Sequence, residues 1–259
     1  MEIKWLVRIW TRYWPMFIRG AGVTLYISII STIIGAAIGL AIGVIHTIPL
    51  PEKGARRVFL KVVNGVLSAY IEFFRGTPMI VQAMVIYFGS AVSFGIHIDR
   101  MFAALLIVSI NTGAYMSEVV RGGIISIDRG QFEAAHAIGM NHVQTMINVV
   151  LPQVIRNILP ATGNEFVINI KDTYVLNIIS VTELFFQTKS IAGNNFRYAE
   201  AFFITSIIYF IMTFTVTRIL RIFERKLDGP ANYDMLGNQM QVQKPESMLG
   251  KDGGLVGRA

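Results

Sequence analysis

The sequence predicts an all-helical integral membrane protein whose single domain crosses the bilayer five times. Of its 259 residues, 53% are hydrophobic and only 15% are charged, whereas about a quarter of a typical soluble domain is charged. The stretch from Ala21 to Pro51 contains no Asp, Glu, Lys or Arg, and a bilayer core needs roughly 20 apolar residues in a helix. This stretch is too long for the apolar region of a signal peptide and therefore predicts a spanning helix.

Five nearly uncharged stretches give the predicted crossings. They are Ala21–Pro51, Gly76–Ile98, Met101–Ser117, about Thr173–Thr182, and Ala201–Thr217. The fourth is the least apolar, because Glu165, Lys171 and Asp172 lie in or beside it. The second must be allowed to begin near Val58 and to contain Glu72 and Arg75. A count of six results if this crossing is split at Glu72, although the segment 58–71 is then short and contains Lys61 and Asn64.

Basic residues predict the orientation of the chain. The loop "PEKGARRVFLK" after the first crossing and the basic residues from Arg218 onward both belong in the cytoplasm. Five crossings then place residues 1–20 outside, although they too carry basic residues. Trp and Tyr side chains alternate with those bases, so we predict an amphipathic helix in the membrane interface over 1–20. The permease domain follows over 21–227, and 228–259 is predicted to be a flexible cytoplasmic tail.

Composition also excludes several classes of chemistry. The net charge of +7 resides largely in short segments beside apolar stretches, which predicts contact with anionic lipid and not with nucleic acid. The chain has no Cys and only four His, and the His positions lack metal-ligand spacing. No phosphate-binding G-x-x-x-x-G-K-[ST] loop is present. We therefore predict no metal, no cofactor and no enzymatic activity in this chain, with any ATP bound by a separate subunit.

A spacing of four residues places Gly35, Gly39 and Gly43 on one face of the first crossing. Such a face permits two backbones to approach closely and so predicts a helix-packing seam. The alternative is that glycine is simply frequent in membrane helices.

The segment 120–156 predicts a pair of short cytoplasmic helices that meet at Gly139. Two capping-box spacings, Asp128 with Gln131 and Asn141 with Gln144, give the helix starts. The first helix is predicted to present an apolar face of Phe132, Ala135 and Ile138, and the second a face of Val143, Met146, Ile147 and Val150. Pro152 is predicted to end or kink the second helix. Pattern alone leaves open whether this hairpin binds a partner or packs on the chain's own helices.

The spacing of Glu133-Ala134-Ala135, Gly139 and Val149-Val150-Leu151-Pro152 resembles the coupling motif of permease subunits in ATP-binding-cassette importers. The family pattern has Ile where this chain has Val149. The resemblance implies a type I importer permease fold whose helix-turn-helix docks into a groove of a cytoplasmic ATPase subunit. The coupling residues that it implies are Glu133, Ala134, Ala135, Gly139, Leu151 and Pro152.

Three further motifs, "EFFRGTPMIVQ", "NTGAYMSEVVRGGI" and "GNEFVINIKDTYVL", resemble the polar amino-acid uptake permeases, the histidine, arginine and glutamine type. The likeness runs from about Gly20 to Leu227. It implies a cytoplasmic-membrane location in a bacterium, an extracytoplasmic binding protein, and a second permease subunit that is identical or paralogous. Glutamine, arginine, histidine and an acidic amino acid all remain open as the cargo.

The first motif raises the question of why Glu72 and Arg75 lie within an apolar segment. One helical turn apart, they can neutralise each other, while Gly76-Thr77-Pro78 opens the helix locally and Thr77 becomes a candidate substrate contact. The alternative is that Arg75 only anchors the helix at the headgroups.

The better candidates for substrate contact lie beside the fourth crossing. Ionisable groups at membrane depth are costly unless they face a cavity or one another. Lys171 is predicted to attract a substrate carboxylate, and Asp172 or Glu165 to receive an ammonium group, with Asn169 and Thr173 donating hydrogen bonds. The alternative is ion pairing within the chain.

Two other functions compete with an importer subunit. One is an intramembrane enzyme that uses Glu72, Lys171 and Asp172 as acid-base groups. The other is a passive pore or scaffold, for which the hairpin would have no role.

Overall fold

The computed structural model describes residues 1–228, which form helices and no strands. The prediction of an all-helical fold is confirmed. The elements are α1 (Ile3–His46), α2 (Ala55–Gly76), α3 (Met79–Phe94), α4 (Arg100–Ile125), α5 (Arg129–Ala137), α6 (His142–Thr145), a π-helical turn (Met146–Val150), α7 (Leu151–Asp172), a 3-10 helix (Thr173–Ile179), α8 (Leu184–Asn195) and α9 (Tyr198–Asp228).

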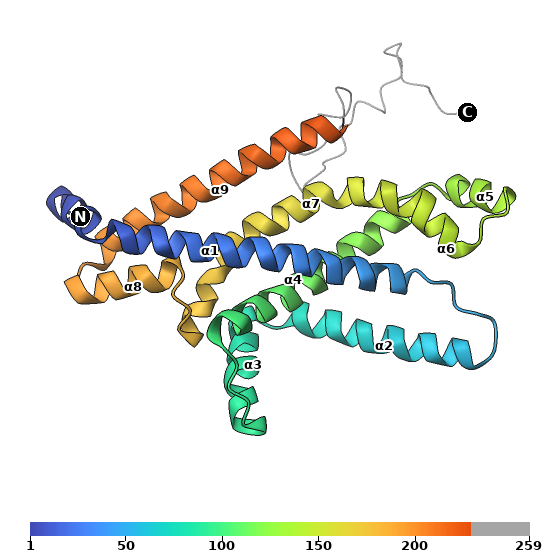
Figure 1. Ribbon diagram of the computed structural model, residues 1–259, viewed down its shortest axis with the longest axis horizontal. Helices are drawn as coiled ribbons and strands as arrows, with labels where there is room; N and C mark the ends of the chain where they lie inside the picture. The colour runs from blue at the N-terminus through green and yellow to red at the C-terminus, as the bar shows by residue number, and fades with distance from the viewer. Residues whose placement is uncertain (229–259) are drawn as a thin grey trace, which may run out of the picture.

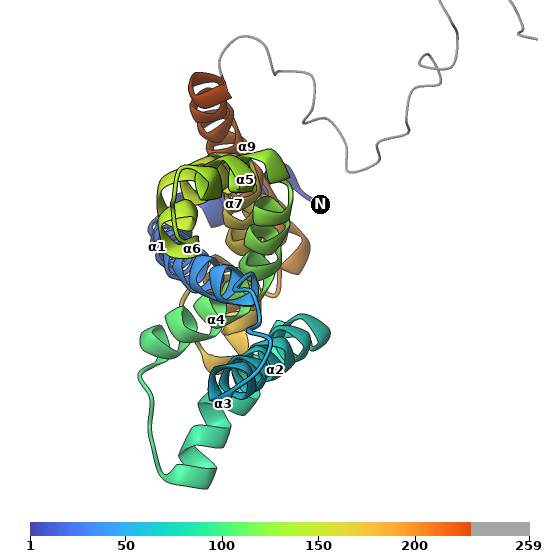
Figure 2. The same ribbon diagram turned by 90° about the vertical axis from the view of Figure 1, so that its right-hand side faces the viewer.

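Most of the helices run along one long axis, with α1 near its centre, whereas α3 is set across it (Figure 1). The N-terminus and α8 are at one end, and α5 and α6 are at the other. Viewed from the α5–α6 end, α2 and α3 lie to one side of the group formed by α1, α4, α5, α6 and α7 (Figure 2). The hairpin of short helices is thus held at the opposite end of the molecule from the N-terminus.

Three helices are long and apolar enough to cross a membrane on their own, namely α1, α4 and α9. A fourth crossing is possible if α2 and α3 count as one bent span, with 112° between them. A second crossing that begins near Val58 agrees with this bent pair, whereas Gly76–Ile98 alone does not, because the bend lies at its start and α3 has only 16 residues. The bend also lies at Gly76–Pro78 and not at Glu72, where the six-crossing count would have split the helix.

The predicted fourth crossing also differs from the structure. The stretch around Thr173–Thr182 begins with a 3-10 helix of seven residues and is not a spanning helix by itself. It continues directly from α7, whose 22 residues are too polar to qualify by composition. The hydropathy pattern favoured one short apolar helix around Thr173–Thr182. The structure instead has the polar helix α7, followed directly by the short 3-10 helix Thr173–Ile179.

The glycine seam predicted on α1 is confirmed. A Cβ atom on Gly35 would lie 2.5 Å from the Thr112 side chain, and one on Gly43 would lie 2.5 Å from Val120. For Gly39 the obstacle includes the backbone of α4, since the Ser117 nitrogen would be 2.8 Å away. Only glycine permits this close approach, so α1 and α4 form the tightest helix pair of the core.

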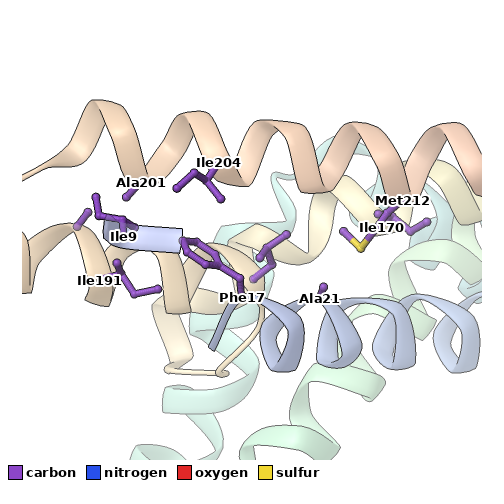
Figure 3. Close-up of a cluster of buried hydrophobic side chains, with 10 residues drawn as sticks. Ile9, Phe17, Ala21, Ile170, Ile191, Ala201, Ile204 and Met212 are labelled. Carbon is purple, nitrogen blue, oxygen red and sulfur yellow. The ribbon is translucent and has the colours of Figure 1, made fainter. Parts of the chain in front are cut away.

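A second core joins the N-terminal part of α1 to α7, α8 and α9 (Figure 3). Ile9 and Phe17 are fully buried there, between Ile191 of α8 and Ala201 of α9. Arg197 adds a polar clamp: its guanidinium is 3.4 Å from the Glu2 carboxylate. The first residues of the chain are therefore fixed to the start of α9.

The segment 1–20 is not bounded by a helix end, because α1 continues from Ile3 to His46 with Pro15 inside it. Figure 1 shows its first turns set at an angle to the rest of α1, which a proline inside a helix explains. Trp10 and Trp14 are exposed, and the interfacial location stays a prediction. The predicted tail, apart from Asp228 at the end of α9, lies outside the described residues.

Candidate functional site

The turn between α5 and α6 is built from a helix C-cap that glycine makes possible. Gly139 has a φ of 84°, in the region that side chains disfavour. Its amide donates to the His136 carbonyl at 2.9 Å, and the Met140 amide donates to the Ala135 carbonyl at 3.0 Å. These two bonds form a Schellman motif, and the prediction that the chain reverses at Gly139 is confirmed.

The two predicted capping boxes have different outcomes. Asn141 and Gln144 form a complete one, with each side chain accepting from the other residue's backbone amide at 2.9 Å. Asp128 caps α5 without Gln131, because its carboxylate accepts from the Gly130 amide at 2.7 Å. Both helices begin where the sequence predicted, but only α6 begins with a complete capping box.

The hairpin has a buried face and an exposed face. Phe132, Met146 and Val150 pack in one cluster with Val120 and Ile124 of α4 and with Ile127, which follows α4. Ala135 is also buried. The other predicted apolar positions point outward: Ile138 is 75% exposed, Val143 63% and Ile147 57%. Each predicted apolar face is thus split between packing and exposure. The coupling candidates divide in the same way, since Glu133, Ala134, Gly139 and Pro152 are exposed whereas Ala135 is buried and Leu151 is partly buried.

The hairpin continues into α7 through a π-helical turn over Met146–Val150. The Leu151 amide bonds to the Met146 carbonyl, five residues back. Pro152 follows within the first positions of α7, where its missing N–H costs little. Of the two predicted outcomes, an end of the helix at Pro152 is wrong, because α7 continues to Asp172; the helix is irregular directly before Pro152, in the π-helical turn.

Asn169 is at the centre of a buried polar cluster that joins three helices. Its amide nitrogen donates to the hydroxyl of Thr32 on α1 at 2.9 Å and to that of Thr112 on α4 at 3.0 Å. All three side chains are buried. Asn169 therefore fixes α7 against α1 and α4, and this use of its amide was not predicted.

Glu165 and Asp172 lie two helical turns apart on α7, and their carboxyl groups interact electrostatically. Both are partly buried. Lys171 points to a different side of the helix, into a groove against α9. Thr173 is buried, and its hydroxyl donates to the Ile170 carbonyl at 3.1 Å. The two acids therefore lie on one side of α7, whereas Lys171 points into the groove beside α9 and interacts electrostatically with the neighbouring Asp172.

The bend between α2 and α3 is stabilised by Gln82, a buried residue that sequence reasoning missed. Its side-chain nitrogen lies 2.9 Å from the carbonyl oxygens of Phe74 and Thr77 and from the Thr77 hydroxyl. Asn111 of α4 donates to the Gln82 carbonyl at 3.0 Å and to Phe74 at 3.2 Å. The predicted opening at Gly76-Thr77-Pro78 is confirmed, and these two amides bond the carbonyls that it leaves unpaired.

The predicted pairing of Glu72 with Arg75 is wrong. In the described part of the chain no ion pair joins them, and both side chains are exposed. The Arg75 guanidinium instead lies over the ring of Tyr115 at 5.5 Å. An exposed ion pair gains little, whereas stacking on Tyr115 gives Arg75 a contact with α4.

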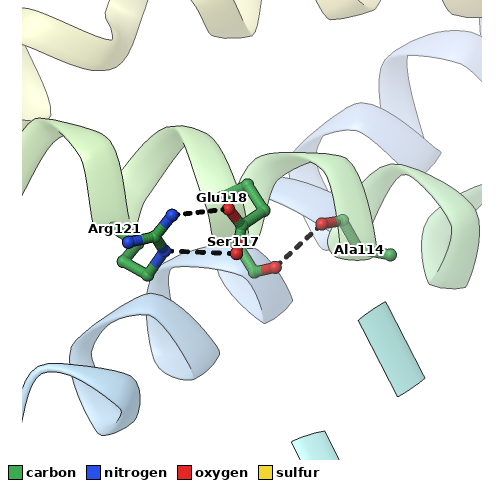
Figure 4. A network of polar contacts seen from close by, with 4 residues as sticks. All are labelled: Ala114, Ser117, Glu118 and Arg121. Carbon is green, nitrogen blue, oxygen red and sulfur yellow. Dashed lines mark hydrogen bonds and ion pairs between the residues drawn. The ribbon is translucent and has the colours of Figure 1, made fainter. Parts of the chain in front are cut away.

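An ion pair that was not predicted lies near the C-terminal end of α4 (Figure 4). The Arg121 guanidinium donates to both oxygens of Glu118, at 3.2 and 2.8 Å. The spacing of three residues on a helix was the signal that could have found it. Among residues 1–228 no group of His, Asp and Glu could hold a metal ion.

These observations define a class of protein. A bundle of apolar helices carries polar groups within its apolar segments, and at one end α7 continues into a polar hairpin with an exposed aliphatic face. This is the architecture of a membrane permease.

Comparison with known proteins gives the family. Residues 53–229 match the family described as binding-protein-dependent transport system inner membrane component. The chain therefore belongs to that family and is an inner-membrane component of a transport system.

Similar proteins share the likeness over most of their length. The glutamine transport system permease protein GlnP of Escherichia coli strain K12 is 37% identical, over 84% of this chain and 97% of its own. The arginine transport system permease protein ArtQ of Bacillus subtilis is 33% identical, over 82% and 93%. A crystal structure of an amino acid ABC transporter with histidines matches with a TM-score of 0.74 and 36% identity, covering 87% of this chain and 100% of that one.

The MetNI methionine ABC transporter in an inward-facing conformation shares the fold. Its TM-score is 0.70 at 20% identity, over 84% of this chain and 99% of that one. The type I importer permease fold implied by the coupling motif is thus confirmed.

Proposed function

We propose that this chain is the permease subunit of an ATP-driven importer that carries a polar amino acid into the cell. The observation that carries the proposal is the continuity of α7, which joins the hairpin to the segment that bears Glu165 and Asp172. A displacement of the hairpin is transmitted along a helix that is anchored at Asn169. The two ends of one rigid element thereby couple a cytoplasmic partner to groups at membrane depth.

The cytoplasmic partner is a separate ATPase subunit. It covers the aliphatic side chains of Ile138, Val143 and Ile147, which would otherwise be exposed to water. Glu133 is exposed on the same short helix as the turn and offers a carboxylate at the edge of this surface. ATP is bound by that partner, because this sequence lacks the phosphate-binding loop.

The substrate is a polar amino acid whose ammonium group faces Glu165 and Asp172. Two partly buried carboxyl groups on one side of a helix favour a cationic ligand group between or beside them. The substrates named for the similar permeases, glutamine and arginine, agree with this class. Asn169 and Thr173 hold α7 in position and do not contact the substrate, because their hydrogen-bond donors are already used within the chain. The predicted role of Lys171 toward the carboxylate stays a prediction.

The importer also needs an extracytoplasmic binding protein and a second permease subunit. The family is defined by dependence on a binding protein. Glu165 and Asp172 are only partly buried in this chain, and a second copy or a paralogue would complete the enclosure around them. The intramembrane enzyme and the passive pore gain no support from the transport family to which the chain belongs.

Uptake by proteoliposomes tests the substrate half of this proposal. The chain is reconstituted with its ATPase subunit and binding protein, and uptake of a panel of polar amino acids is measured. Asp172→Asn and Glu165→Gln are expected to lower uptake at least tenfold, whereas Glu224→Gln on α9 serves as the matched control. Unchanged uptake in both α7 variants would exclude these carboxylates as substrate contacts.

Co-purification tests the coupling half. Val143→Glu places a charge on the exposed aliphatic surface and is expected to abolish recovery of the ATPase subunit. Leu50→Glu adds the same charge at an exposed aliphatic residue in the loop after α1 and should leave recovery unchanged. Equal recovery with both variants would show that the hairpin is not the ATPase-binding surface.

A further inference from the structure

The relative position of α4 and α7 follows from two contacts between them. The Asn169 amide donates to the Thr112 hydroxyl at 3.0 Å, and a Cβ atom on Gly123 would lie 2.8 Å from the Ile158 side chain. The same number of residues separates Thr112 from Gly123 as separates Ile158 from Asn169. The two helices therefore run antiparallel in one constant register, and each residue of α4 has a known counterpart at its level on α7.

Tyr115 lies on the side of α4 that points away from α1. The side toward α1 is marked by Met116, which packs directly against Gly39. In a helix, residues three and four positions after a given one lie on opposite sides of it, about 60° and 40° away. Tyr115 and Met116 are therefore on opposite sides of Thr112. The Tyr115 side chain is 40% exposed, so a ligand can reach it.

Glu165 lies on the corresponding side of α7. The side toward α1 is marked by Thr162, which borders a groove together with Ile33 of α1. Around α7, Thr162 and Glu165 lie on opposite sides of Asn169. The register also places Glu165 at the level of Tyr115. Both side chains therefore lie on one face of the α4–α7 pair, opposite α1.

A cation from α2 reaches this same face. The Arg75 guanidinium lies over the Tyr115 ring, 5.5 Å from its centre, which orients the cation. Arg75 interacts electrostatically with Glu118, but both oxygens of Glu118 already accept from Arg121. Within residues 1–228 no ion pair includes Arg75 or Glu165. The N–H groups of Arg75 thus have no carboxylate of this chain as an acceptor.

A base and an acid that share a face without pairing favour a ligand that carries both charges. A free amino acid is such a ligand, because it has a carboxylate and an ammonium group. Guanidinium matches a carboxylate with two parallel hydrogen bonds. Lys171 is less suited to this role, since it points into the groove beside α9 and interacts with Asp172.

We propose that Arg75 binds the α-carboxylate of the transported amino acid while Glu165 faces its ammonium group. This inference rests on the proposed importer function and adds the residue that recognises the carboxylate common to all amino acids. Tyr115 is a positioning residue, because its ring orients the guanidinium and does not itself bind the substrate. The bound amino acid connects α2 with α7 on the face that a second subunit would enclose.

Binding of amino acids and of their α-carboxamides to the same complex tests this assignment. The permease–ATPase complex is purified in detergent without the binding protein, and dissociation constants are measured by calorimetry. The probes are L-arginine, L-glutamine, L-histidine and L-glutamate, each compared with its α-carboxamide, which keeps the ammonium group but lacks the negative charge. The variants are Arg75→Gln and Lys171→Gln. Arg56→Gln is the matched control, because it removes another exposed arginine from the same helix.

We expect the wild type to bind the carboxylate form of its substrate about tenfold or more tightly than the amide. Arg75→Gln should lose most of this preference by weakening only the carboxylate form, whereas Arg56→Gln and Lys171→Gln should retain it. Equal weakening of both forms by Arg75→Gln would indicate a structural role and overturns the proposal. It is also overturned if the wild type binds no probe or does not discriminate, or if Lys171→Gln abolishes the preference.

Two substitutions of Tyr115 test the positioning role. Tyr115→Phe retains the ring and should keep the preference for the carboxylate form, whereas Tyr115→Leu removes the ring and should reduce that preference severalfold. A wild-type preference in Tyr115→Leu overturns the positioning role.

Uptake distinguishes a failure of this assignment from a failure of the importer function. ATP-dependent uptake by the wild type is measured in proteoliposomes made from the same preparation. Its absence would count against the importer itself. Uptake that persists while Arg75→Gln discriminates like the wild type would overturn the role of Arg75 alone.

Discussion

The hairpin of α5 and α6 and the seam between α1 and α4 are stabilised in opposite ways. In the hairpin, residues within six positions of one another make the decisive contacts: the Schellman bonds at Gly139 and the capping box of Asn141. In the seam, the contacts join positions far apart in sequence, such as Gly39 with Ser117. The difference teaches that the part that meets a partner can be shaped by local rules, whereas the bundle depends on complementary surfaces of distant helices.

The largest effect is expected in the seam, for Gly39→Val. Its Cβ would lie within 2.8 Å of backbone atoms of α4, which cannot move aside as a side chain could. Overpacking of this kind costs about 3 kcal/mol or more. Thermal unfolding of the detergent-solubilised chain, followed by size-exclusion chromatography, should show a clearly lower midpoint.

Gly22→Val is the matched control, because a Cβ at Gly22 meets nothing within 4 Å. It should unfold at the wild-type midpoint. An equal loss for both glycines would mean that glycine acts through the flexibility of α1 and not through the approach of α4.

Asn169→Leu should give the next largest effect. The substitution keeps the volume of the side chain but leaves the buried Thr112 hydroxyl without its partner on α7, at a cost of about 1–3 kcal/mol. Asn164→Leu, at an exposed position of the same helix, should cost almost nothing. A double-mutant cycle with Thr112→Val should return a coupling of about 1 kcal/mol; strict additivity would contradict a direct role for this hydrogen bond.

The features that the sequence predicted are mostly those stabilised by local contacts, and the features it missed depend on contacts between distant helices. The start of α6 at Asn141, the reversal at Gly139 and the opening at Gly76–Pro78 were all readable, because each depends on the chemistry of a few adjacent residues. The glycine seam was readable as a face, but nothing in the sequence identified α4 as its partner. Hydropathy failed at α7, where the polar Asn169 is compensated by hydrogen bonds to Thr32 and Thr112 that only the folded chain reveals.

The candidate site shows the same limit. Glu165, Asn169, Lys171 and Asp172 were selected because they are ionisable or polar groups in or beside an apolar stretch, but the sequence did not give the directions of their side chains. The structure turns Asn169 inward, Lys171 toward α9 and the two acids to one side. Gln82 was missed because an amide in an apolar helix has no local signal; its role appears only beside the carbonyls left by the bend.

A smaller and confined effect is expected for Gly139→Val. Nothing lies within 4 Å of a Cβ at this position, so the cost is purely conformational and amounts to about 1–2 kcal/mol. The variant should retain the unfolding midpoint of the bundle but bind the ATPase subunit more weakly. Gly139→Asn should retain most of the binding, since Asn tolerates the left-handed conformation. A lowered midpoint for Gly139→Val would show that the hairpin and the bundle unfold together.

The smallest effect concerns the capping box, through Asn141→Ala and Gln144→Ala. Each substitution removes one of the two reciprocal bonds at 2.9 Å. The Asn141 side chain bonds a helical amide that has no other partner, so its loss should cost about 1 kcal/mol. Gln144 bonds the amide of a residue outside the helix, which water can reach, so its loss should cost less. Hydrogen exchange of the α6 amides measures both, and faster exchange confined to residues 141–146 is the expected result. Faster exchange in α7 as well would mean that the loss of the cap spreads through the π-helical turn. The hairpin and α7 would then not be stabilised independently of each other.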